Sequence, residues 1–527
     1  MVIAIAECPK RSLTIFAWTP SASSNAAAVA GGRENERSGI WPLVEICSTI
    51  TRSWPRDFRA QTTGSSRLRN QLLEIAGGIV LKSVLMASLF LAAVLPPTTG
   101  SLAVAAPPIP IAVARHVFAR ANALCSADGG RLWGVSLCGP LMLADPQTHE
   151  AIANVPVLDA KRDGSYYRFT LAADAPIGNA PFEYGGIRFA QIKWPLKGGT
   201  EKQAVTLMHE SFHRIQPKLG FVVNGAREEG WMISGDPALD TETGRIWLRG
   251  EIHALRRALT SSGIARKEAL SDALELRAYR DAILPSTVVP EHVLDVMEGL
   301  AESTGIDVGV PHACRIAYTL RDMRIVEDAS NYAREFFFAI GPAYAELLDA
   351  VEPNWRRMVV PKTSIASLAA RGFGIKVVTP SASAAQAILA RYGGAAIERE
   401  EAVRERRRVA REAEYRAELV TGPTLRLPMK DFRISFNAKY TQRLGRYGTV
   451  YHHVIVSAPW GRIKVSHGDA MIDGNFSSLT VAAPATLAGS TLHGNGWVLE
   501  LSPGEKIVPD SKKPGSYTVA SPPLPRD

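Results

Sequence analysis

The feature that most constrains this chain is residues 204–216, which contain two histidines separated by three residues. In a helix, His209 and His213 lie one turn apart on the same face, so both imidazoles can bind a single metal ion. Glu210 lies next to them, at an offset from which its carboxylate can reach a water held by the metal. The pattern therefore predicts a metal site that activates water, with Glu210 as the general base.

The residues around this motif predict that it lies on a helix. Thr200 and Gln203 have the spacing of a capping box, and Pro217 would end a helix of roughly 16 residues. Between these ends, apolar side chains recur at helical spacing, namely Val205, Met208, Phe212 and Ile215. The alternative interpretation is a pair of ordinary histidines on a core helix.

A catalytic zinc ion needs a third protein ligand and one open coordination position. Two glutamates compete for the third position: Glu298, within residues 296–305, and Glu251, within residues 247–255. The glutamate that does not bind the metal would lie on a solvated helix surface or hold a histidine tautomer.

The motif Glu298-Gly-Leu-Ala, together with the two histidines, resembles the Glu-Gly-Phe/Leu-Ala element of the gluzincin zinc peptidases, which include aminopeptidase N-like and thermolysin-like enzymes. The resemblance implies that His209, His213 and Glu298 bind one Zn²⁺ ion and that Glu210 is the catalytic base. It also implies peptide or protein substrates.

The resemblance covers two short motifs and not the whole chain. Here 84 residues (214–297) separate His213 from Glu298, many more than in the aminopeptidases, and Ser303 stands where a tyrosine is common. No Gly-x-Met-Glu-Asn element, with which aminopeptidases hold a free amine, precedes the metal helix. The resemblance therefore does not imply exopeptidase action. Candidates for stabilising an oxyanion are Tyr332, Arg334, Tyr344 and His312.

The first 105 residues differ from the rest of the chain. Residues 1–79 combine low complexity with scattered arginines, so we expect either a disordered segment or a mis-annotated extension. Residues 80–105 have the charged, apolar and small-residue regions of a secretory signal peptide; the alternative is a buried apolar helix. The apolar run is too short for a membrane span. We therefore expect an exported protein, periplasmic or secreted, with no stable span in the mature chain.

Two cysteines are consistent with export. Cys125 and Cys138 flank a glycine-rich turn and could close a small loop by a disulfide bond in an oxidising compartment. Two free buried thiols are the alternative. The sequence has no Cys-x-x-Cys pair, so no zinc site built on sulfur is predicted.

The pattern of the remaining chain predicts an α+β protein. Residues 106–196 alternate in short runs typical of a β-rich lobe, followed by a mainly helical, zincin-like catalytic domain over residues 197–395. A charged helical linker (396–420) leads to an all-β, sandwich-like accessory domain (421–527). The run Ile187–Trp194 is expected to be either an edge strand that pairs with an extended substrate or a core strand.

The net charge of the chain excludes few classes of partner. The formal net charge is +9, and the basic residues of the linker alternate closely with acidic ones, so no nucleic-acid partner is predicted. Two other functions compete with a peptidase: a non-catalytic envelope-binding protein with a structural metal site, and a hydrolase of a non-peptide amide. A structural site would want a fourth ligand, for which Glu251 is available.

Overall fold

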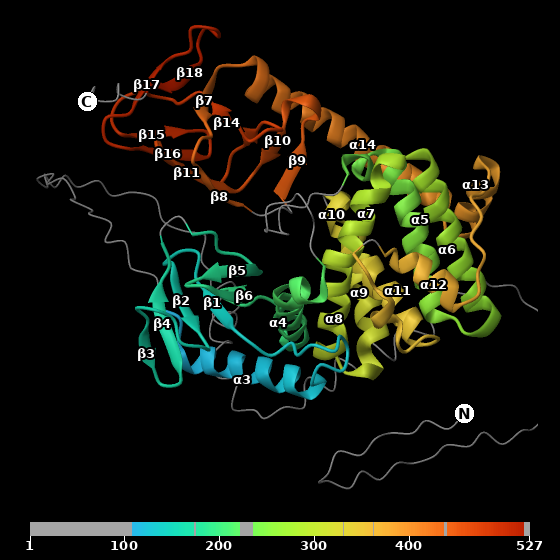
Figure 1. The fold of residues 1–527 in the computed structure, drawn as a ribbon. Helices are drawn as coiled ribbons and strands as arrows, with labels where there is room; N and C mark the ends of the chain where they lie inside the picture. The colour runs from blue at the N-terminus through green and yellow to red at the C-terminus, as the bar shows by residue number, and fades with distance from the viewer. Residues whose placement is uncertain are drawn as a thin grey trace, which may run out of the picture. The chain divides into compact units, whose positions relative to one another are not determined.

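The computed structural model describes residues 108–172, 175–221, 236–329, 331–361, 363–436 and 440–520. The predicted signal peptide and the residues before it lie outside these described residues. Along the described chain, an N-terminal β-sheet is followed by a helical region and then by two further β-sheets (Figure 1). This order confirms the predicted α+β class. No described helix is both long and apolar enough to cross a membrane.

The N-terminal sheet has six strands in the order β3-β4-β2-β1-β6-β5. Only β1 and β6 are parallel, and the other neighbours are antiparallel. Both faces of the central strands are covered, because Leu141 and Leu143 lie in one core and Met142 and Ala144 in another. The strands are β1 (Leu141–Ala144), β2 (Glu150–Ala153), β3 (Lys161–Asp163), β4 (Tyr166–Thr170), β5 (Ala180–Tyr184) and β6 (Ile187–Lys193).

The expectation that Ile187–Trp194 forms an edge strand is wrong. Strand β6 pairs with β1 on one side and β5 on the other, so it lies inside the sheet. A two-residue turn at Gly185 and Gly186, both with positive φ, folds β5 back beside β6 as a hairpin. The edge is therefore β5, one strand earlier in the chain.

A helix precedes this sheet, within residues 106–196, for which the sequence pattern predicted a β-rich lobe and no particular helix. Helix α3 (Ile111–Asp128) buries Ala114, Val117, Phe118 and Ala121, which recur at helical spacing. Two of the four are alanines, so the apolar stripe is weak and was missed.

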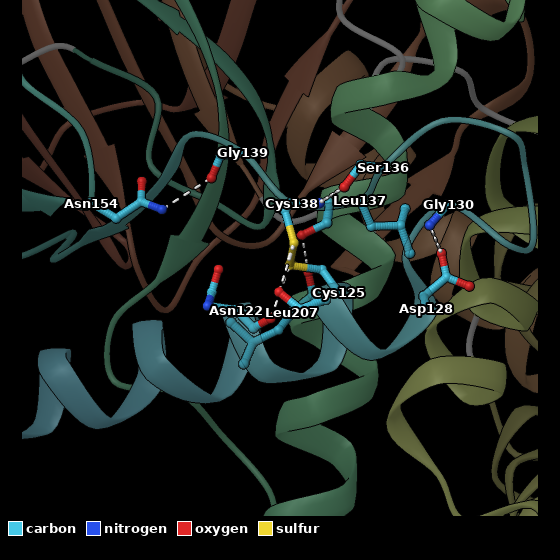
Figure 2. The surroundings of a disulfide bond; sticks show 12 residues. Asn122, Cys125, Asp128, Gly130, Ser136, Leu137, Cys138, Gly139, Asn154 and Leu207 are labelled. Atoms are coloured by element: carbon cyan, nitrogen blue, oxygen red, sulfur yellow. Dashed lines mark hydrogen bonds between the residues drawn. A yellow bond between two sulfur atoms is a disulfide. The ribbon is translucent and has the colours of Figure 1, made fainter.

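The Cys125 thiol at the end of α3 forms a disulfide bond with Cys138, which excludes the alternative of two free thiols (Figure 2). The carbonyl oxygens of Leu137 and Cys138 each accept a hydrogen bond of 3.0 Å from Arg214. Because Arg214 belongs to helix α4 (Thr200–Ile215), the disulfide-closed loop is tied to the helix that carries the histidines.

The helical region shares one hydrophobic core with α3, α4 and one face of the sheet. The linker helix α14 is not free, since Arg249 of α5 pairs with Glu400 and Glu401 at 2.6 and 2.9 Å. The helices are α5 (Glu242–Thr260), α6 (Gly263–Ile283), α7 (Val288–Leu294), the π-helical turn η6 (Asp295–Gly299), α8 (Leu300–Gly309), α9 (Arg315–Glu327), α10 (Tyr332–Glu335), α11 (Phe337–Asp349), α12 (Ile365–Gly372), α13 (Ala382–Arg391) and α14 (Gly394–Arg416).

The C-terminal region contains a seven-stranded sheet, β17-β18-β7-β14-β13-β10-β9, and a five-stranded sheet, β15-β16-β12-β11-β8. Their buried side chains form a core of their own, which includes Leu427, Val456 and Trp497. The strands are β7 (Thr424–Pro428), β8 (Arg433–Phe436), β9 (Thr441–Arg443), β10 (Thr449–Tyr451), β11 (Val454–Ala458), β12 (Gly461–Val465), β13 (Ala470–Ile472), β14 (Ser478–Ala482), β15 (Thr491–Gly494), β16 (Trp497–Leu501), β17 (Lys506–Pro509) and β18 (Tyr517–Ala520).

Candidate metal centre

Helix α4 carries the metal motif, as predicted, but it begins differently. Its N-cap is Gly199 and no side chain caps it, so the predicted capping box of Thr200 and Gln203 does not form. The Gln203 amide instead donates a hydrogen bond of 3.0 Å to the carbonyl oxygen of Gly198. The α-helix ends at Ile215, where a short 3₁₀ turn, η2 (Gln216–Leu219), continues the chain.

The side chains of His209, Glu210 and His213 are buried together on this helix, with exposed fractions of 6%, 4% and 9%. One ligand atom from each can be chosen so that all three lie within 4.8 Å of one another. The two Nε2 atoms are 2.9 Å apart. The group has the composition of a metal site, as the sequence predicted.

Glu298 lies opposite the histidines, on the π-helical turn η6. Its Oε2 atom is 3.6 Å from Nε2 of His209 and 3.5 Å from Nε2 of His213. With the 2.9 Å between the histidines, these distances form a triangle that an ion bound about 2.0–2.2 Å from each atom can occupy. The structure thus brings Glu298 to the two histidines despite the long separation in sequence.

Glu251, the competing glutamate, is held elsewhere. Its side chain is fully buried, with Oε2 2.5 Å from Arg280 and Oε1 accepting a hydrogen bond of 2.8 Å from the Tyr344 hydroxyl. Glu291 also pairs with Arg280, at 2.7 Å. Both oxygens of Glu251 are therefore engaged in a buried ionic cluster.

Close packing of α8 on α4 explains how Glu298 comes within 3.6 Å of the two histidines. A Cβ atom on Gly305 would lie 2.6 Å from the carbonyl oxygen of Val205, and one on Gly309 would lie 2.8 Å from its amide nitrogen. Glycine at both positions lets the two backbones approach. Glu298 and Glu302 precede these glycines at helical spacing, on the same face.

Glu302 and Arg334 form hydrogen bonds with His209 and Glu298, two of the candidate metal ligands. Oε2 of Glu302 lies 2.8 Å from Nδ1 of His209, and its Oε1 pairs with Lys202 at 3.1 Å. Arg334 donates a hydrogen bond of 2.8 Å to Oε1 of Glu298. A carboxylate on Nδ1 fixes the tautomer that leaves Nε2 free for a metal. No sequence motif predicted a role for Glu302, although it lies one helical turn after Glu298.

The three carboxyl groups around the histidines differ in acidity. Burial opposes ionisation of Glu302, but the charge of Lys202 and the hydrogen bond with His209 outweigh it and lower the pKa of Glu302 to about 2. Against the same effect of burial, Arg334 and the two histidines hold the pKa of Glu298 well below its usual range. For Glu210 burial prevails and raises the pKa. Glu210 is thus the carboxyl group most ready to accept a proton.

The site opens into a cleft of about 980 Å³. Its walls include the edge strand β5 and strand β8, together with Met297, Val326 and Phe338. The Phe338 ring stacks on His209, with ring centroids 5.7 Å apart and planes at 18°. Glu210 also lines this cleft, and its buried Oε2 atom has no hydrogen-bond partner among the described residues.

Of the four oxyanion candidates, Arg334 lines the cleft. The Tyr332 hydroxyl donates to the carbonyl oxygen of Glu327, and the Tyr344 hydroxyl is taken up by Glu251. His312 lies in a short 3₁₀ turn before α9 and is not among the residues of the cleft.

No model of a known protein family matches this chain, and no curated protein or solved structure is significantly similar to it. The evidence for function is therefore the site itself: a buried His-Glu-x-x-His group on a helix, which could hold a metal ion.

Proposed function

We propose that the protein is an exported zinc metallopeptidase in which His209, His213 and Glu298 bind Zn²⁺. The observation that carries the proposal is the triangle formed by their three ligand atoms at the base of an open cleft. Two imidazoles and one carboxylate are a common ligand set of catalytic zinc. When bound, zinc polarises carbonyl groups and lowers the pKa of water.

Glu210 is the proposed general base. Its offset on the helix keeps it beside the ligand triangle, and burial raises its pKa, which makes its carboxylate a stronger base than an exposed glutamate. It would take a proton from the attacking water and later deliver it to the leaving amine. Arg334, which lines the cleft, is the proposed residue that stabilises the developing negative charge.

The engagement of Glu251 favours a catalytic site over a structural one. A structural zinc site is closed by a fourth protein ligand, and Glu251 was the candidate from the sequence. Because Arg280 and Tyr344 occupy its two oxygens, Glu251 would not close the coordination shell of a bound metal.

A peptide substrate fits the walls of the cleft. Strand β5 is the last strand of its sheet and lines the cleft, so an extended chain could pair with its backbone. Export is supported by the disulfide bond between Cys125 and Cys138, which is consistent with an oxidising compartment. The signal peptide over residues 80–105 stays a prediction.

Substitution of Glu210 by glutamine tests the proposal. We expect Glu210→Gln to retain zinc but to hydrolyse peptides about 100-fold to 10,000-fold more slowly, the usual effect of losing a general base. His213→Ala should lose most of the zinc, while Glu201→Gln, on the first turn of the same helix, should change neither property. Zinc content and turnover of an unstructured protein substrate are measured for each variant. Full activity of Glu210→Gln would refute the mechanism.

A further inference from the structure

Gln216 connects the two halves of the metal centre through a single side-chain amide. It is the first residue after α4 and is only 1% exposed. Its Oε1 atom lies 2.7 Å from Nδ1 of His213. Its Nε2 atom donates hydrogen bonds of 3.1 Å to the carbonyl oxygen of Val296 and 2.9 Å to that of Met297.

These contacts determine the orientation of the amide. Backbone carbonyl oxygens only accept hydrogen bonds, so the amide nitrogen must face Val296 and Met297. The amide oxygen must then face His213, and because this oxygen only accepts, Nδ1 of His213 must carry the proton. His213 is thereby held in the tautomer whose Nε2 lone pair points toward His209 and Glu298.

The same amide donates a hydrogen bond to a backbone carbonyl group of the opposite helix, where the helix has a π turn. In η6, the amide of Leu300 donates to the carbonyl oxygen of Asp295, five residues earlier. In an α-helix it would donate to Val296, so the π turn removes the usual partner of that carbonyl. Gln216 supplies a side-chain donor to this carbonyl inside the protein, where an unpaired carbonyl is costly.

We propose that Gln216 is a positioning residue that sets the tautomer of His213 and stabilises the π turn that presents Glu298. The proposal rests on the proposed function, since it assumes that these two residues bind zinc. It assigns Gln216 no contact with substrate. Its effect is on the geometry and affinity of the metal site.

Zinc affinity and the spectrum of the cobalt-substituted protein test the proposal. We expect Gln216→Leu to weaken zinc binding about 10-fold to 100-fold, as is typical when a partner of a ligand is lost, and to change the visible absorption bands of bound Co²⁺. Gln216→Glu keeps an acceptor for His213 but has no donor for the two carbonyls, so it should also bind zinc more weakly. The control is Gln203→Leu, on the same helix, whose amide contacts only the carbonyl of Gly198 among the described residues. Circular dichroism checks that each variant is folded.

The outcomes separate this inference from the proposed function. If the wild-type protein binds zinc, and Gln216→Leu binds it equally well with an unchanged cobalt spectrum, the positioning role is refuted and the peptidase proposal stands. If the wild-type protein binds no zinc, the peptidase proposal fails. In either case, ¹⁵N NMR of His213 in the metal-free wild-type protein must show the Nδ1–H tautomer; an Nε2–H tautomer overturns the inference without requiring any variant to fold.

Discussion

At the scale of single residues, the carboxyl groups of the candidate metal centre differ in the charged side chains that they contact. Glu298 and Glu302 each contact a cation, Arg334 and Lys202 respectively, whereas Glu210 lies in the same pocket and contacts none of the described cations in a salt bridge. The first two are therefore held as anions, suited to bind a metal or a histidine, and the third is suited to exchange a proton.

Glu298 and Glu251 should respond differently to truncation. Glu298→Ala removes an anionic ligand, so we expect it to release most of the zinc while the chain stays folded. Glu251→Ala should retain zinc but lower the free energy of unfolding by about 3–5 kcal/mol, because Arg280 loses a buried partner. Zinc analysis and urea unfolding of both variants measure these effects. Release of zinc by Glu251→Ala alone would make Glu251 the third ligand.

The sequence predicts that His209, Glu210 and His213 form one group because their proximity depends only on spacing within one helix, and the structure places the three together. Glu298 was predicted as a ligand through the resemblance of the motif Glu298-Gly-Leu-Ala to that of the gluzincins. The contacts of Gln216 with Val296 and of Arg334 with Glu298 could not be predicted in this way, since they depend on which segment lies opposite. Nothing in the local sequence shows that Gln216 reaches a carbonyl 80 residues away.

At the scale of elements, the contact between α4 and α8 is the central one. The stripe Glu298, Glu302, Gly305 and Gly309 on one segment faces Lys202, Val205 and His209 on the other. The glycines set the distance between the two backbones, and the carboxylates reach the metal motif as a result.

A methyl group at Gly305 should disturb the metal centre. Gly305→Ala places a Cβ atom 2.6 Å from the Val205 carbonyl oxygen, so the helices must separate. We expect zinc affinity to fall more than tenfold and the free energy of unfolding to fall by about 1–3 kcal/mol, the usual cost of overpacking. The control is Gly199→Ala, at the N-cap of α4, where an added Cβ would meet no atom within 4 Å. Isothermal titration with zinc and chemical unfolding measure both quantities.

A helix or strand could be predicted from the sequence where its apolar residues recur at a regular spacing. Its place in the fold could not be predicted where that place depends on which strands pair. The metal helix was predicted with its length, since its apolar stripe is clear. The edge position of β5 was not, because alternation indicates a strand but not its neighbours. Helix α3 was missed because alanine contributes little to an apolar pattern.

At the scale of the whole molecule, the described chain has separate hydrophobic cores. One joins α3, the sheet and the helices, and another lies between the two C-terminal sheets. The sequence pattern predicted a β-rich lobe over residues 106–196 and a helical domain over residues 197–395; in the structure, side chains from both ranges contribute to the first of these cores. A smaller cluster of Tyr415, Leu419, Leu444, Val450 and Met471 connects the end of α14 to the C-terminal strands.

Separate cores predict separate thermal transitions. We expect calorimetry to show at least two, and saturating zinc to raise only the transition of the part that contains His209 and His213. At a zinc concentration about 1,000 times the Kd, the stabilisation would be about 4 kcal/mol. In His213→Ala the zinc-dependent shift should vanish. A shift of every transition by zinc would show that the cores unfold as one unit.

The distance in sequence between His213 and Glu298 also orders events as the chain folds. A loop of 84 residues must close before Glu298 reaches the two histidines, and α5 and α6, joined by only two residues, lie within that loop. This local hairpin can form early and shortens the loop that remains. The histidine pair alone is complete as soon as α4 exists, but it lacks the carboxylate. We therefore expect tight metal uptake to be a late step, because it must wait until α8 has docked on α4 and the carboxylate of Glu298 has reached the two histidines.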